Sequence, residues 1–330
     1  MTSPLLKTPL AGVTATVRVP GTSANLGPGF DSLGLAVSLY DTLSITTLDT
    51  LELEFDLSGE GVAELPRDAS HLVVKTLDLA LARLGYIRGG LRVAAVNVLP
   101  HGRGLGSSAS AIVAAIMAAN ALVDTADRQD LAWVLQLASE LEGHPDNVAP
   151  AIFGAVAVSW QEGEGYASAK VTPSDVVVPV VAIPDVELKT ERARGMLPAT
   201  VPHADAAANS GRAALLMHAL TADPSLLLAG TRDYLHQDYR AAAMPESAAL
   251  VAGLRAEGFA AFISGAGPTV MVLANGGAEA DTIVQRITDL DANARTNAQA
   301  NVQRGAEHGV SWRVLRLQLD LEGAKVEVHP

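Results

Sequence analysis

A glycine-rich loop, Gly102-Arg-Gly-Leu-Gly106, carries the strongest local signal for chemistry in the sequence. Its three glycines lack a Cβ atom, so the backbone can approach a ligand closely. Ser107 and Ser108 then open a predicted helix, whose first N–H groups have no partner within the helix and whose dipole favours an anion. This combination is typical of a phosphate-binding loop. An ordinary strand–helix loop capped by a serine is the alternative interpretation.

The loop differs from the two commonest nucleotide-binding loops. A Walker A loop ends in Gly-Lys-Ser/Thr, whereas Gly106 is followed by Ser107 here. A dinucleotide fingerprint would need glycine in place of Ser107. The pattern therefore argues against an NAD-dependent oxidoreductase.

A second cluster, Glu140-Leu-Glu-Gly-His-Pro-Asp-Asn147, follows a predicted helix. Mg²⁺ prefers one or two carboxylates together with phosphate oxygens, so one glutamate, a serine hydroxyl and a nucleotide would form a sufficient site. The alternative is a helix that ends at Gly143 and exposes its acidic residues to solvent.

Three further segments could contact a ligand. Ser23–Asp31 is a tight turn, and Ser264–Pro268 could close over a ligand or form a plain hairpin turn. Arg194 and Arg240 could together bind a carboxylate through bidentate hydrogen bonds. Taken singly, the turns are also typical of plain loops, and each arginine of a solvated basic face.

The elements that must position these residues follow from hydrophobic periodicity and from glycine and proline positions. The predicted strands are 14–20, 42–48, 51–57, 91–99, 153–160, 176–183, 259–263, 270–274 and 312–319. The predicted helices are 71–84, 107–122, 128–142, 204–220, 223–240, 245–257 and 278–290, the last followed by a polar stretch to 308. We expect two α+β domains, 1–165 and 166–330, divided at the polar turn 161–165.

Composition restricts the classes of function. The chain has 330 residues, 49% of them hydrophobic, and a net charge of −13, which disfavours broad binding to nucleic acids or anionic membranes. It has no cysteine, which excludes disulfides and thiolate metal sites and fits a reducing compartment. Residues 1–16 lack the pattern of a signal peptide, and no apolar run reaches about 18 residues. We expect a soluble cytoplasmic protein.

Three motifs match, in order, those of the GHMP small-molecule kinases. They are Val19–Asp31, Pro100–Ala109 and Ser264–Thr269, so the resemblance covers nearly the whole chain. The strings Ser23–Asp31 and His144–Pro150 are similar to the branch of this family that acts on L-homoserine, a step toward threonine. The resemblance implies an ATP-dependent kinase with a two-domain α+β fold, like ribosomal protein S5 domain 2 in the first half and ferredoxin-like in the second. It also suggests a homodimer.

The resemblance implies a role for each matching residue. ATP would be bound by His71, Pro100, His101, Gly102, Arg103, Gly104, Leu105, Gly106, Ser107, Ser108, Ala109 and Ser110. Mg²⁺ would be held by Ser108 and Glu142, with Glu140 as the alternative carboxylate. The L-homoserine pocket would be lined by Asn25, Asp31, His144, Asn147, Arg194 and Arg240. The two arginines would hold its carboxylate, and Asn147, Arg194 and Thr190 would act closest to the reaction.

Asn147 stands where mevalonate-type kinases have an aspartate that acts as a general base. An asparagine cannot accept a proton at neutral pH, so the expected mechanism relies on positioning and charge stabilisation. The alternatives are another kinase of this family, acting on mevalonate or a sugar, and a regulator that binds a ligand without catalysis.

Overall fold

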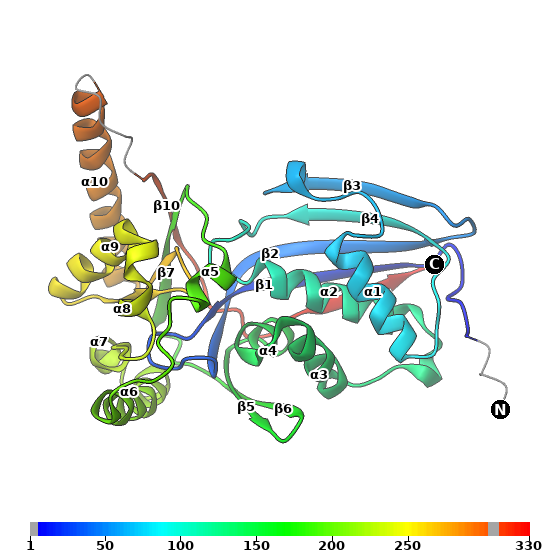
Figure 1. Ribbon diagram of the computed structural model, residues 1–330, viewed down its shortest axis with the longest axis horizontal. Helices are drawn as coiled ribbons and strands as arrows, with labels where there is room; N and C mark the ends of the chain where they lie inside the picture. The colour runs from blue at the N-terminus through cyan, green and yellow to red at the C-terminus, as the bar shows by residue number, and fades with distance from the viewer. Residues whose placement is uncertain (1–5, 303–309) are drawn as a thin grey trace.

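The computed structural model describes residues 6–302 and 310–330. Within these residues the larger sheet has seven strands, of which five follow the order β11-β1-β2-β4-β3 while β5 pairs with β2 and β6 with β5. The strands are β1 (Thr14–Ala24), β2 (Leu33–Leu48), β3 (Leu53–Gly59), β4 (Gly90–Asn97), β5 (Val156–Glu162), β6 (Gly165–Val171) and β11 (Lys325–His329). Figure 1 shows this sheet along the long axis of the molecule.

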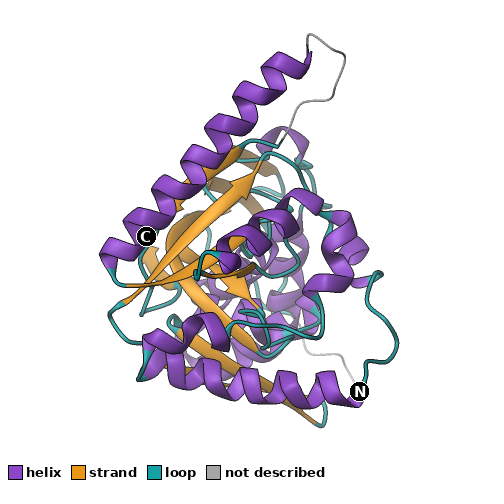
Figure 2. Ribbon diagram, turned by 90° about the vertical axis from the view of Figure 1, so that its left-hand side faces the viewer, coloured by secondary structure: helices purple, strands orange, loops and turns teal. Residues whose placement is uncertain are grey.

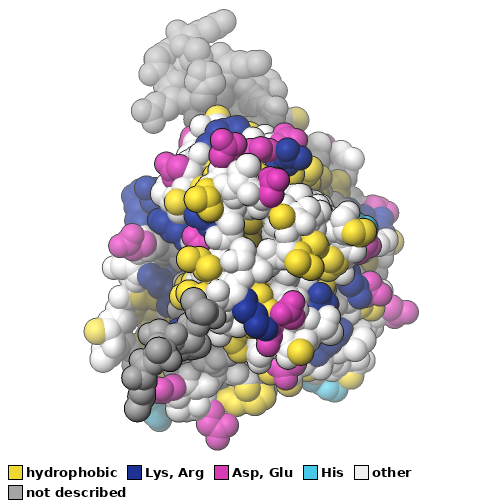
Figure 3. All heavy atoms as spheres, turned by 90° about the vertical axis from the view of Figure 1, so that its right-hand side faces the viewer, with side chains coloured by type: hydrophobic (Ala, Val, Ile, Leu, Met, Phe, Trp, Pro, Cys, Tyr) yellow, Lys and Arg dark blue, Asp and Glu magenta, His cyan; other side chains and the backbone are white. Residues whose placement is uncertain are grey.

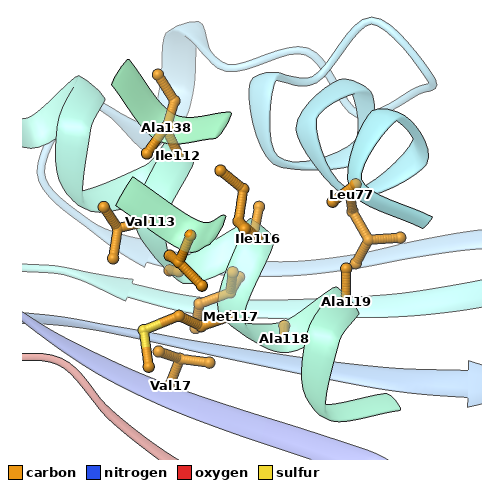
Figure 4. Packing of buried hydrophobic residues seen from close by; sticks show 14 of the residues in the cluster. Val17, Leu77, Ile112, Val113, Ile116, Met117, Ala118, Ala119 and Ala138 are labelled. Atoms are coloured by element: carbon orange, nitrogen blue, oxygen red, sulfur yellow. The ribbon is translucent and has the colours of Figure 1, made fainter. Parts of the chain in front are cut away.

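Four helices cover one face of the larger sheet (Figure 1). They are α1 (Leu72–Arg83), α2 (Ser107–Leu122), α3 (Leu131–Glu142) and α4 (Pro145–Phe153). Helix α2 lies in the middle of this layer, and most of its residues are buried and apolar. Its many alanines allow close approach to α1, α3 and β1. In Figure 4, Ala119 of α2 lies beside Leu77 of α1, and Met117 of α2 lies beside Val17 of β1. The helix that follows the glycine loop is therefore the central element of the core, which fixes its N-terminus firmly.

The smaller sheet is fully antiparallel, in the order β10-β7-β9-β8. Its strands are β7 (Val177–Pro184), β8 (Ala260–Ile263), β9 (Val270–Asn275) and β10 (Trp312–Arg316). Numbered along the chain, this order is fourth, first, third, second, which is the ferredoxin-like order expected from the resemblance. Helices accompany it: α5 (Thr190–Arg194), α6 (His203–Thr221), α7 (Leu227–Gly230), α8 (Gln237–Arg240), α9 (Pro245–Ala256) and α10 (Gly277–Val302).

Helix α10 extends well beyond the body of the molecule (Figure 2). The sequence predicted its end near residue 290, but the described helix continues to Val302. The part of the predicted polar stretch at 303–308 lies outside the described residues. Short 3₁₀ turns complete the described chain at Val62–Glu64, Thr125–Asp127, Pro224–Leu226 and Ala241–Ala243.

Four elements differ from the predictions. Helix α4 was not predicted. It begins at Pro145, and proline is well tolerated in the first turn because no partner is needed for its missing N–H. The predicted helix 223–240 is broken after Gly230, because the Asp233 carboxylate accepts the backbone N–H groups of Leu235, His236 and Gln237. Strands β6 and β11 were not predicted.

The boundary predicted after residue 165 lies in the turn of the β5–β6 hairpin, and both strands belong to the larger sheet. The chain passes to the smaller sheet only after Val171. Strand β11 later returns to pair with β1, from Thr14 opposite His329 to Arg18 opposite Lys325. The first domain is thus built from both ends of the chain.

No helix among the described residues is both long and apolar enough to span a membrane. On the face shown in Figure 3, acidic and basic side chains are interspersed, without an extended patch of one sign.

Candidate active site

Three segments far apart in the sequence meet at the N-terminus of α2. The Ser264 hydroxyl lies 2.6 Å from the carbonyl oxygen of Gly104 and 2.9 Å from the Ser23 hydroxyl. The Asn25 side-chain amide donates to the carbonyl of Gly265 at 2.9 Å. The turn at 23–31, the glycine loop and the 264–268 loop therefore form one structure, at the junction of the two sheets.

The glycines of the loop are required by close contacts. A Cβ atom on Gly104 would lie 2.2 Å from the carbonyl oxygen of Ser264, and one on Gly106 would lie 2.0 Å from the Thr22 hydroxyl. Both glycines have positive φ, 75° and 72°, which residues with a side chain rarely adopt. Gly106 is the N-cap of α2 and no side chain caps this helix, so its first N–H groups remain available to an anion.

Two cavities open beside this loop. One, of about 240 Å³, is mainly apolar, and the other, of about 90 Å³, is mainly polar. Gly102, Ser107 and Ser108 line both, so the cavities adjoin across the start of α2. This arrangement suits a ligand with an apolar ring, a phosphate chain at the loop and a small polar acceptor beyond it.

The predicted residues divide between these cavities. Those lining the polar cavity are Asn25, Asp31, Pro100, Gly102, Arg103, Gly104, Leu105, Gly106, Ser107, Ser108, Glu142, His144, Asn147, Thr190, Arg194 and Arg240. His71, His101 and Ser110 line the apolar cavity. Ala109 lines neither, because its side chain faces the hydrophobic core beneath the helix.

His71 lies in the wall of the apolar cavity as the N-cap of α1. Its Nδ1 accepts the backbone N–H of Val73 at 3.2 Å, which leaves the proton on Nε2. Nε2 is buried and has no hydrogen-bond partner among the described residues. A ring with an acceptor nitrogen would supply that partner, because a buried N–H without one is costly.

Ser108 and Glu142 face each other across the loop. The Ser108 hydroxyl donates to Glu142 Oε2 at 3.1 Å, and burial raises the pKa of Glu142. Glu140 instead faces outward, where it contacts Arg83 and Gln136. A carboxylate and a hydroxyl oxygen are donors that a hard divalent cation prefers, with phosphate oxygens completing the shell. Of the two glutamates, the geometry therefore favours Glu142.

His144 and Asn147 lie at the N-terminus of α4, and each is held by a neighbour. His144 Nδ1 lies 2.5 Å from Asp146 Oδ1. Burial lowers the pKa of His144, but the hydrogen bond and charge of Asp146 raise it by more, so its pKa exceeds the usual value. The Thr22 hydroxyl donates to Asn147 Oδ1 at 2.8 Å, which directs the amide NH₂ of Asn147 away from Thr22.

Asp146 was not among the predicted site residues, although it is buried in the first turn of α4 and lines the polar cavity. The signal was present in the string, because an aspartate two residues after a histidine at a helix start can accept from its ring. That interpretation requires α4, which was not predicted.

The two arginines reach the cavity from the second domain. Arg194 in α5 forms a bidentate pair with Asp31, at 2.8 and 3.1 Å. Figure 1 shows α5 beside the start of α2. Arg240, at the end of α8, is 2% exposed and donates through Nε to the carbonyl of Ala193 at 3.2 Å. An acid and two guanidinium groups thus surround one small cavity, which suits a ligand carrying both charges.

The side chains of two predicted site residues, Arg103 and Asn25, form hydrogen bonds with other parts of the protein. The Arg103 guanidinium donates to the carbonyls of Pro184 and Asp185 and pairs with Glu187, so it ties the glycine loop to the second domain. Asn25 uses its amide on Gly265 and its oxygen on the N–H of Asp31.

Family models match both halves of the chain. The family model for the GHMP kinases N terminal domain matches residues 71–155, and the model for the GHMP kinases C terminal domain matches residues 206–292. A protein of *Streptomyces coelicolor* named homoserine kinase is 50% identical over 94% of this chain and 93% of its own. The chain belongs to the GHMP kinase family.

Two solved structures are similar in fold to this GHMP kinase. A homoserine kinase from *Cytophaga hutchinsonii* superposes with a TM-score of 0.81 at 26% identity, over 95% of this chain and 97% of that one. A mevalonate diphosphate decarboxylase from *Staphylococcus aureus* gives 0.64 at 15% identity, over 96% of this chain and 98% of that one, and this second likeness concerns the fold alone. The two-domain α+β fold expected from the motifs is confirmed.

Proposed function

We propose that this protein is a homoserine kinase, which transfers the γ-phosphoryl group of ATP to the side-chain hydroxyl of L-homoserine. The main support is the polar cavity, where Asp31, two arginines and the N-terminus of α2, which suits a phosphate, meet. Relatives named homoserine kinase, 42–50% identical over nearly the whole chain, support the choice of acceptor.

The nucleotide would lie across both cavities. The adenine ring would enter the apolar cavity, where its acceptor nitrogens could receive the Nε2–H of His71. The phosphates would lie on the amides of the glycine loop and the first turn of α2. Kinase chemistry requires a divalent metal with ATP, and we propose Mg²⁺, held by Ser108 and Glu142. When bound, Mg²⁺ neutralises charge on the transferring phosphoryl group.

The acceptor would enter the polar cavity as a zwitterion. Its carboxylate fits Arg194 and Arg240, because a planar guanidinium binds a carboxylate through two hydrogen bonds. Its ammonium fits Asp31, which pairs with Arg194 in this structure. Binding of the acceptor would thus replace the ion pair between Asp31 and Arg194 by one ion pair from Asp31 to its ammonium and another from the arginines to its carboxylate. Thr190 and Asn25 would line the wall of the cavity beside it.

The hydroxyl would lie between the phosphates and Asn147. The Asn147 NH₂ group can donate to the hydroxyl oxygen and orient it, but it cannot remove the proton. Catalysis would therefore come from positioning and from charge stabilisation by loop amides, as expected for phosphoryl transfer. The acceptor oxygen would bond to the γ-phosphorus as the bond to ADP breaks, and the hydroxyl proton would pass late to an oxygen of the transferred phosphoryl group. We propose that the protein acts in the cytoplasm. That it forms a homodimer stays a prediction.

The test is release of ADP from ATP in the presence of Mg²⁺ and a panel of acceptors. We expect turnover with L-homoserine and at least about a hundredfold lower kcat/KM with mevalonate or galactose, since neither offers an ammonium and a carboxylate on one carbon. Faster turnover of mevalonate or a sugar would favour that other branch of the family. Binding of L-homoserine and ATP without turnover would favour a regulator.

A further inference from the structure

His236 lies outside the set of residues that the motifs indicate, yet it is completely buried beside the acceptor cavity. It precedes α8, between Asp233 and Arg240. Its Nε2 is 2.8 Å from the carbonyl oxygen of Gly27. Because a carbonyl oxygen only accepts, Nε2 must carry the proton in this contact.

The other ring nitrogen makes the complementary contact. Nδ1 lies 3.2 Å from Nη1 of Arg240, and a guanidinium only donates, so Nδ1 must be unprotonated. The two contacts agree on one neutral tautomer. Burial is the main cause that lowers the pKa of His236, with the charge of Arg240 acting in the same direction and that of Asp233 against it.

The environment leaves the ring little freedom. It stacks against Phe30 at 5.2 Å between ring centroids, and the Arg240 guanidinium lies 5.4 Å from the centre of the same ring. Asp233, the acid that lies 3.6 Å from Nε2, is occupied by three backbone N–H groups of the turn. The imidazole is therefore fixed by the chain on both sides.

Arg240 is oriented by what its donors can reach. Nε donates to Ala193, and Nη1 to His236 and, at 3.5 Å, to Gly265. Nη2 makes no hydrogen bond to any described residue, while Arg240 lines the polar cavity. Two of the three nitrogens are thus committed to the scaffold, and the third is left for a ligand.

We propose that His236 is a positioning residue that holds the Arg240 guanidinium in the orientation required by the acceptor's carboxylate. In this role the neutral imidazole accepts a hydrogen bond from Arg240 at Nδ1. Its Nε2–H donates to the carbonyl oxygen of Gly27 and so holds the 25–31 turn in place. The proposal rests on the proposed function, since the carboxylate is that of L-homoserine.

Two variants separate these contacts. In His236→Asn, the amide oxygen can take the place of Nδ1 and accept from Arg240, but nothing reaches Gly27. In His236→Gln, the longer amide can donate to Gly27, but the acceptor for Arg240 is lost. Both remove the ring, so the loss of stacking on Phe30 is common to the pair.

We expect KM for L-homoserine to rise about tenfold or more in His236→Gln, as loss of one hydrogen bond to a charged group predicts, and about threefold or less in His236→Asn. KM for ATP and kcat should change little in either, because the contact acts through acceptor binding. Equal rises in both variants, or a larger rise in His236→Asn, would overturn the proposal in favour of a purely structural role.

A second measurement does not depend on the acceptor. The ¹⁵N chemical shifts of the histidine rings in the wild-type protein should show His236 protonated at Nε2 and unprotonated at Nδ1 at about pH 7. A proton on Nδ1 would reject the inference even if the variants fail to fold. Absence of L-homoserine turnover by the wild type would instead reject the proposed function and leave this spectrum to decide the inference about the ring.

Discussion

At the scale of single residues, Glu140 and Glu142 are only two positions apart, yet one lies at the candidate site and the other at the surface. Helix α3 places them on different sides, so Glu142 reaches Ser108 and Glu140 reaches Arg83. The sequence left this choice open because the register of the helix end near Gly143 was unknown.

This pair supplies a matched test of the proposed metal site. Glu142→Gln keeps the shape but removes the charge that a divalent cation prefers, so we expect kcat to fall by about two orders of magnitude, comparable to the loss of one charge-stabilising group. Glu140→Gln should stay within about twofold of the wild type, as an exposed substitution usually does. The measurement is initial rate against Mg²⁺ concentration. Equal losses in both variants would contradict the assignment.

His71 links burial to pH. Burial lowers its pKa, against a smaller effect of Asp68, so the unfolded chain binds this proton more readily than the folded protein. The contribution of neutral His71 to the free energy of unfolding is therefore lost as the pH falls through the ordinary histidine pKa of about 6.5. His71→Asn keeps a good N-cap without a titrating ring.

We expect the free energy of unfolding of the wild type, relative to His71→Asn, to decrease between about pH 7.5 and 5.5. Urea denaturation at the two pH values measures this difference. A relative stability that stays constant or increases on acidification would show that the His71 ring is not disfavoured in its charged form.

At the scale of elements, the glycine loop and α2 were predictable because they depend on local sequence. Glycines without Cβ atoms, two serines and a long apolar run are sufficient to predict a loop and a helix at 107–122, and the helix has these bounds. Helix α4 was missed because Pro145 can end a helix or begin one, and only the packing of the apolar residues after it decides.

The loop also supplies a matched pair of substitutions. Gly102 and Gly104 both have positive φ, 62° and 75°. A Cβ on Gly102 would meet nothing closer than 3.6 Å, whereas one on Gly104 would lie 2.2 Å from the carbonyl oxygen of Ser264. Gly102→Ala therefore adds backbone strain alone, and Gly104→Ala also forces the two loops apart.

We expect Gly102→Ala to lower the free energy of unfolding by about 1 kcal/mol and Gly104→Ala by about 3 kcal/mol or more, with loss of measurable ATP binding. Thermal unfolding and titration calorimetry with Mg·ATP would measure both effects. If the two variants bind ATP equally well, the contact between the glycine loop and Ser264 is not needed for the proposed binding of the phosphates.

At the scale of the whole molecule, the two halves are not independent. Strand β11 from the end of the chain pairs with β1, and Arg103 ties the glycine loop to the end of β7. The turn at 161–165 resembled a linker because it is polar and glycine-rich, but the same composition is typical of a hairpin turn. No local signal distinguishes the two, since the pairing of β5 with β6 and of β1 with β11 is decided by tertiary contacts.

A fragment comprising residues 1–165 tests this interdependence. It lacks β6 and β11, so β5 and β1 would expose unpaired edges. We expect the full chain to unfold in one cooperative thermal transition and the fragment to show none. A fragment with a sharp transition and a near-UV circular dichroism spectrum like that of the full chain would mean that the boundary predicted after residue 165 is correct.

The most direct test of the central claim is the identity of the phosphorylated product. Incubation of the protein with ATP, Mg²⁺ and L-homoserine should give, by ³¹P nuclear magnetic resonance, a phosphate monoester coupled to the two protons on the side-chain carbon that carries oxygen, together with one ADP for each ester. The same experiment with Ser108→Ala should yield far less ester. A wild-type protein that produces ADP and inorganic phosphate but no ester, or that leaves ATP intact, would contradict the account.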